Sequence, residues 1–240
     1  APKAWEIATG REILVGMFDD ACDVDHEDLR DNYIGTGQDV SLTPIFAGYT
    51  NPRPKIFGDD HGTAVMGLMA ASANDRGVRG VAYGAKFTAS RGLQDFITDA
   101  DIATAYTFAV EKKVDVHNNS WGPASPEIPT AQVIVEAIQT AFHDGRDPDG
   151  AGPRPPRGMV IFFATGNDER ELVPAADYAA LPEVIAVGAG SIDDKVSDFS
   201  NFGSEIEFLA PSGDDFRANI ATTDVDDAAG YPTQGYNVGG

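Results

Sequence analysis

The sequence is poor in cysteine, in basic residues and in long apolar runs. Its single cysteine, Cys22, excludes an intrachain disulfide and leaves the cellular compartment undecided. No apolar run approaches the ~20 residues that a transmembrane helix needs, so we expect no membrane span. The chain opens without the basic and then apolar pattern of a signal peptide, but removal of a leader would leave the same picture.

Basic residues are scarce relative to acidic ones. There are 17 Lys and Arg against 38 Asp and Glu, a formal net charge of −21. This balance argues against nucleic acid or an anionic membrane as a partner, because phosphate binding needs a basic face. It suits basic peptides or bound cations, calcium above all. A role in solubility alone explains the charge equally well.

Short apolar runs alternate with helical patterns along the chain. Continuous apolar character predicts strands covered on both faces, as in parallel sheets, at 12–18, 113–117, 158–164 and 184–189. Apolar residues recur at helical spacing over 101–113 and 130–143. Such alternation is typical of an α/β domain with right-handed crossovers. With 240 residues and no internal repeat, we expect a single domain over 1–240.

Three segments carry residues of catalytic type. The acids Asp19 and Asp20 end the first apolar run, at the sheet edge where α/β proteins form their sites. His61 opens a helical segment rich in small residues. Asn167 follows another buried run, where a side-chain amide can donate to an oxyanion. Taken singly, each has a more ordinary interpretation as a turn acid, a structural histidine or a loop asparagine.

Together and in this order, the segments resemble the motifs of the subtilase family of serine proteases. The matching segments are 13–20, 25–29, 61–67, 119–122, 164–167, 174–175, 184–189 and 198–203. The subtilisin triad runs Asp, His, Ser along the chain, and the acid and the histidine stand in that order here. The resemblance covers essentially the whole chain. It implies a three-layer, mostly parallel α/β fold with helices on both faces, serine endopeptidase activity, peptide or protein substrates and a secreted or extracytoplasmic location.

The resemblance also implies residue roles. Asp19 would orient His61, His61 would act as general base, and Asn167 would donate to the oxyanion. The family's serine stands in a Gly-Thr-Ser segment, and no serine of this chain has those flanks. We therefore expect the domain to be incomplete at both ends, with the serine on a missing segment or a second chain. A serine-less homologue that binds peptides stays open, as does an acidic calcium-binding or nucleotide-binding domain with chance motifs.

The details lean towards the kexin and furin branch of the family, which cuts after basic residues. The residues assigned to substrate binding on this basis are Asp20, Ser120, Trp121, Gly122 and Asp177. Three features depart from that branch: Gly58 and Ser125 stand where it has acids, and the acid-rich run after Gly166-Asn167 is rearranged. A broad or hydrophobic preference therefore stays open.

A structural calcium site is also implied by the resemblance. Asp28 and Asn74 fall at ligand positions of the strong site in many subtilases, and the loop would add the carbonyls of Ser72, Arg76 and Val78. Carboxylate, amide and carbonyl oxygens are the ligands that Ca²⁺ takes. An ordinary surface loop is the alternative.

Overall fold

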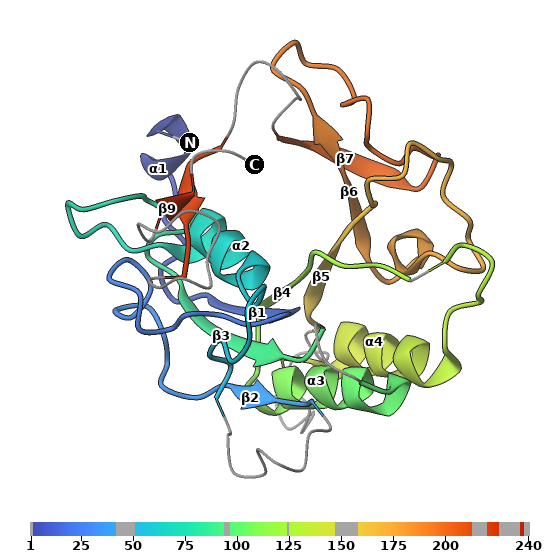
Figure 1. Ribbon diagram of the computed structural model, residues 1–240, viewed down its shortest axis with the longest axis horizontal. Coiled ribbons are helices and arrows are strands. Elements are labelled where there is room, and N and C mark those ends of the chain that lie inside the picture. The colour runs from blue at the N-terminus through green and yellow to red at the C-terminus, as the bar shows by residue number, and fades with distance from the viewer. Residues whose placement is uncertain are drawn as a thin grey trace.

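Seven parallel strands form the central sheet of the computed structural model, which describes residues 2–41, 51–93, 97–123, 125–146, 158–212, 220–225 and 236–237 (Figure 1). The strand order is β2-β3-β1-β4-β5-β6-β7. Their bounds are β1 Leu14–Asp19, β2 Gln38–Asp39, β3 Lys86–Arg91, β4 Val116–Asn119, β5 Val160–Ala164, β6 Ile185–Gly190 and β7 Ile206–Pro211. Two short strands, β8 Thr222–Thr223 and β9 Tyr236–Asn237, pair antiparallel outside this sheet.

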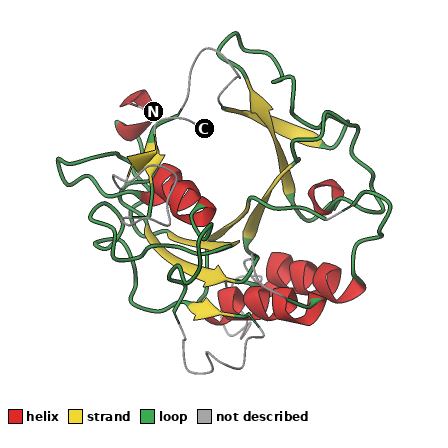
Figure 2. Ribbon diagram, in the orientation of Figure 1, coloured by secondary structure: helices red, strands yellow, loops and turns green. Residues whose placement is uncertain are grey.

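Helices cover both faces of the sheet, as Figure 2 shows. On one face lies α2, His61–Ala70, and on the other α3, Asp99–Glu111, packs beside α4, Gln132–Asp144. Two short elements, α1 Pro2–Trp5 and the 3₁₀-helix η2 Tyr178–Ala180, complete the described structure. The predicted three-layer α/β fold with a parallel sheet is confirmed. None of the described helices combines the length and the apolar character needed to cross a membrane.

The predicted apolar runs leave out β2, β3 and β7, and of these β3 lies beside β1 within the sheet. Its sequence, Lys-Phe-Thr-Ala-Ser-Arg, is largely polar, yet Thr88, Ser90 and Arg91 are all buried. Arg91 is only 1% exposed because its guanidinium donates to the buried carboxylate of Asp59 at 2.7 and 3.0 Å. A buried charge is tolerated when it is paired and hydrogen-bonded, so polarity alone does not exclude a central strand.

The two faces of the sheet are filled to different degrees. On the α3 and α4 side, Ile161 and Phe163 of β5 belong to a cluster that includes Ile134 and Ile138. On the α2 side, the core gathers under β1 and β3 around Met66. Phe162 of β5 points to that same side but lines an open groove instead. Parallel sheets are normally covered on both faces, so, among the residues that the structure describes, this half of the α2 side is unusually bare.

Candidate active site

The first turn of α2 meets the carboxyl end of β1. Asp19 is the last residue of β1 and His61 the first of α2, and the Asp19 Oδ1 lies 2.8 Å from the His61 Nδ1. Asp19 is 1% exposed, whereas the imidazole is 46% exposed. One ring nitrogen is thus fixed by the acid while the ring stays open to a reactant. The hydrogen bond that the ring donates to Asp19 raises the pKa of His61 to about 9, against the effect of burial.

A glycine makes this contact possible. A Cβ built on Gly62 would lie 2.1 Å from the carbonyl oxygen of Ala21 and 2.8 Å from the Cβ of Asp19. Any larger residue would push the start of α2 away from β1, since real Cβ atoms do not approach a backbone oxygen so closely. The glycine directly after His61 therefore allows the short distance between His61 and Asp19.

Asp20 follows β1 directly and lies against the first turn of α2. It is 2% exposed, and its oxygens accept hydrogen bonds from the backbone N–H groups of Ala21, His61 and Gly62. The carboxylate thus holds the N-terminus of α2, where negative charge is favourable. Burial and the neighbouring charge of Asp19 raise its pKa to about 6 despite these bonds. Its carboxylate is buried and already accepts three N–H groups, so its predicted contact with a basic substrate side chain stays a prediction.

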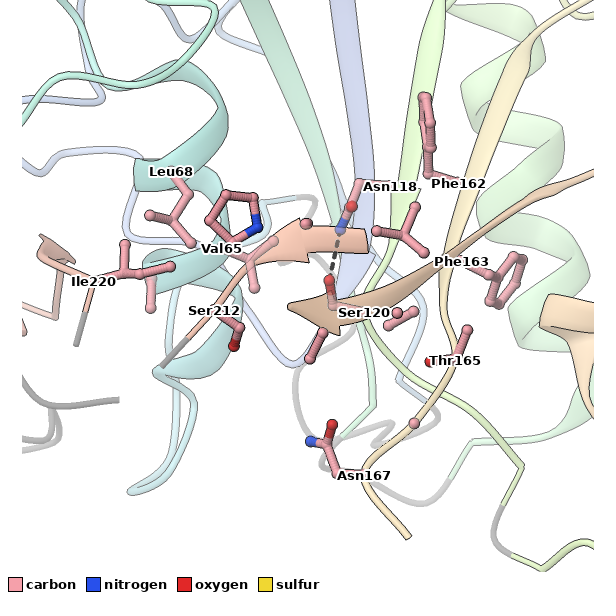
Figure 3. A pocket seen from close by; sticks show the side chains of 18 of the residues that line it. Val65, Leu68, Asn118, Ser120, Phe162, Phe163, Thr165, Asn167, Ser212 and Ile220 are labelled. Carbon is pink, nitrogen blue, oxygen red and sulfur yellow. Dashed lines mark hydrogen bonds between the residues drawn. The ribbon is translucent and has the colours of Figure 1, made fainter. Parts of the chain in front are cut away.

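Asn167 stands on the loop after β5 with its side chain exposed (Figure 3). The loop is clamped by Asn201, which is fully buried, donates to the Thr165 carbonyl and accepts from the N–H groups of Asp168 and Arg170. Gly166 turns at φ +98° and approaches Asn201 too closely for a side chain. Asn201 lies within one of the matching motifs, but nothing in the sequence identifies it as the residue that positions the loop.

A groove of about 610 Å³ joins these groups. His61 and Asn167 line it together with Ser120, whose hydroxyl accepts a hydrogen bond from Asn118 at 2.9 Å (Figure 3). Much of the remaining wall is apolar and comes from α2, β5 and β6, namely Val65, Leu68, Phe162, Val187 and Ala189. In the part of the chain that the structure describes, no serine or threonine hydroxyl is hydrogen-bonded to His61.

A smaller pocket of about 130 Å³ adjoins the groove and is lined by Trp121, Gly122 and Asp177. Gly122 is exposed, and a Cβ there would meet nothing within 4 Å. Asp177 is not free to pair with a ligand, because Arg170 donates to both of its oxygens at 2.7 Å. Asp177 does line this pocket, but as the partner of Arg170, so its assignment to substrate binding stays a prediction. Nothing in the sequence singles out Arg170 as its partner.

Four of the residues predicted to bind calcium, Asp28, Ser72, Asn74 and Val78, are linked by hydrogen bonds. Asp28 is fully buried, and its oxygens accept hydrogen bonds from the Asn74 side chain and the Val78 N–H. Ser72 donates its N–H to the Asp28 carbonyl, while its buried hydroxyl has no hydrogen-bond partner among the described residues. Within the same described ranges, no Lys or Arg pairs with Asp28. The residue types therefore fit Ca²⁺, although Asn74 turns its nitrogen towards the carboxylate and its oxygen towards the Arg76 N–H.

Comparison with known proteins decides the family. The subtilase family model matches residues 10–238. The chain belongs to the subtilase family. A solved structure of a protease from Pseudoalteromonas arctica has a TM-score of 0.73 and 26% identity, and it covers 99% of this chain and 76% of that one. The fold is therefore subtilisin-like.

Two curated subtilase relatives extend the comparison. The calcium-dependent protease of Nostoc is 29% identical over 98% of this chain and 36% of its own length. The major intracellular serine protease of Bacillus subtilis is 31% identical over 88% of this chain and 61% of its own length. The chain thus spans less than two thirds of these relatives. Kexins are also similar, so the kexin-like branch is not singled out. Since an intracellular protease is among the relatives, the family does not establish secretion.

The pKa of His61 can be measured without any catalysis. We expect an NMR titration of its imidazole to give a midpoint near pH 9, and Asp19→Asn to return it towards 6.5. Because the folded pKa lies above the unfolded one, the stabilisation from this proton is complete below about pH 6.5 and is lost as the pH rises through about 9. A midpoint near 6.5 in the unaltered chain would contradict the pairing.

Proposed function

We propose that this subtilase is a serine endopeptidase in which Asp19, His61 and Asn167 are the catalytic residues carried by this chain. The supporting observation is the 2.8 Å contact between Asp19 and His61 at the edge of the groove that Asn167 also lines. A buried acid, a solvent-open imidazole and an exposed amide are the three groups that acyl transfer needs besides its nucleophile.

In this mechanism the neutral form of His61, which prevails above about pH 9, acts as general base through the ring nitrogen that Asp19 does not hold. It takes the proton of a serine hydroxyl while the serine oxygen bonds to the peptide carbonyl carbon, and the carbonyl oxygen becomes an oxyanion. Asn167 donates to that oxyanion. The proton then passes from His61 to the leaving amine, and water hydrolyses the acyl-enzyme in the same way.

The serine itself is proposed to come from a segment that fills the groove. Two observations support this: the described hydroxyls do not bond to His61, and the groove wall is apolar where a parallel sheet would normally be covered. The relatives are also longer than the region that matches this chain. An apolar helix that starts with the serine beside His61 would satisfy both requirements.

Serine-directed labelling of the full-length gene product tests this assignment. We expect a fluorophosphonate reagent to modify one serine outside residues 1–240, with the labelling lost in His61→Ala because the hydroxyl is no longer activated. Peptide mapping by mass spectrometry locates the site. A label on a serine within 1–240 would contradict the proposed source of the nucleophile. Peptide binding without labelling would favour the serine-less homologue.

Loss of the Asn167 amide should affect the transition state selectively. We expect Asn167→Ala in the full-length enzyme to lower kcat by ~10²–10³ and to change KM little, because the amide binds the oxyanion better than the ground-state carbonyl. Steady-state kinetics on a chromogenic peptide measure both constants. Asn51→Ala, outside the groove, is the matched control. An unchanged kcat would leave Asn167 as an ordinary loop residue.

We also propose a structural Ca²⁺ held by Asp28, by Asn74 after its amide turns over, and by the Ser72, Arg76 and Val78 carbonyls. The fully buried carboxylate, which has no basic partner among the described residues, supports it. Calcium at 100 times its dissociation constant should stabilise the fold by about 2.7 kcal/mol. Thermal unfolding in calcium and in chelator measures this, and Asp28→Asn should remove the difference. If the unaltered chain melts at the same temperature in calcium and in chelator, the site is refuted.

A further inference from the structure

The pocket beside the groove is placed to receive a substrate side chain. It shares Ala164, Thr165 and Gly166 with the groove that contains His61 and Asn167. A peptide whose carbonyl lies between those two residues would therefore extend a neighbouring side chain past Gly122 into this pocket. The inference rests on the proposed function, because it takes the groove to hold a peptide.

The charges inside the pocket are already paired with one another. Arg170 donates to both oxygens of Asp177 at 2.7 Å, and the Val173 N–H donates to one of them as well. The Asp177 side chain is 4% exposed and that of Arg170 22%. Burial disfavours the charge of Asp177, but the bonds from Arg170 and Val173 outweigh it and lower its pKa. The acid is therefore charged and paired, and of these two lining side chains that of Arg170 is the more exposed.

This arrangement changes which side chain the pocket accepts. We propose that Arg170 masks Asp177, so that the pocket takes an uncharged side chain and rejects Lys and Arg. Two-point pairing of a guanidinium with a carboxylate is among the stronger hydrogen-bonded contacts in proteins. An entering ammonium would have to break it or lie beside the guanidinium, where like charges repel.

The remaining acid of the pocket does not reverse this balance. Asp168 lies 3.6 Å from the Arg170 Nε, so it too is partly neutralised by Arg170. Its side chain is 67% exposed, and water and salt weaken its pull on a ligand. Removal of Arg170, the cation among the residues that line the pocket, would leave two acids around it. Arg170 is thus the residue that decides between uncharged and basic side chains.

Binding of labelled peptides to the full-length protein tests this independently of cleavage. In a His61→Ala background, fluorescence anisotropy would compare fluorescein-labelled tripeptides that end in Leu, Gln or Lys. We expect the Leu or Gln peptide to bind at least about tenfold more tightly than the Lys peptide. Arg170→Gln, which keeps hydrogen-bond donors but removes the charge, should raise affinity for the Lys peptide by at least about tenfold. Adding Asp177→Asn should abolish that gain.

Arg53→Ala is the matched control, since Arg53 also pairs with an aspartate through two bonds, to Asp25, but lies outside both cavities. Arg53→Ala changes the net charge by the same amount as Arg170→Gln, and it should leave the peptide preference unaltered. Preference for Lys in the presence of Arg170, an effect of Arg53→Ala as large as that of Arg170→Gln, or absence of peptide binding would each overturn the inference. Selective binding combined with absence of hydrolysis by the unaltered protein would instead count against the proposed function alone.

Discussion

The close contact between the start of α2 and the end of β1 is the constraint on which the site depends. The Cβ that Gly62 lacks would lie 2.1 Å from the Ala21 carbonyl, so the two segments are as near as backbones allow. At that distance Asp20 can accept the N–H groups of the first turn and Asp19 can reach the imidazole. The two adjacent acids therefore have separate roles. Asp20 fixes the start of α2, and Asp19 fixes the imidazole of His61, the first residue of that helix.

Several buried carboxylates of the chain are hydrogen-bonded or ion-paired. Asp20 and Asp28 are stabilised by N–H groups, whereas Asp59 and Asp177 are each held by an arginine. Buried carboxylates require such partners, because an unpaired charge in the interior is costly. The formal net charge of −21 therefore says little about the charge inside the pockets, where individual acids are paired. This is why an excess of acids, by itself, does not predict a preference for basic substrates.

The sequence predicts the fold well and the site in part. Apolar runs place β1, β4, β5 and β6 within a few residues, because strands buried on both faces cannot avoid such runs. They miss β3, whose buried polar residues depend on partners elsewhere in the chain, such as Asp59 for Arg91. Dependence on a partner elsewhere in the chain also explains why the surroundings of Asp177 could not be predicted. Its position could be aligned with a pocket acid, but its pairing with Arg170 follows from the path of the loop that Asn201 clamps.

The groove links the packing of this domain to its proposed chemistry. On the α3 and α4 side, the chain covers β5 with its own residues, and Phe163 is 1% exposed. On the α2 side, Phe162 and Val187 line open space next to His61. An apolar segment laid there would gain free energy from covering those side chains, on the order of 25 cal/mol per Å² of apolar surface. Because the same segment would begin beside His61, the energy that completes the core would also hold the nucleophile in place. Assembly of the core and assembly of the triad would then be a single event.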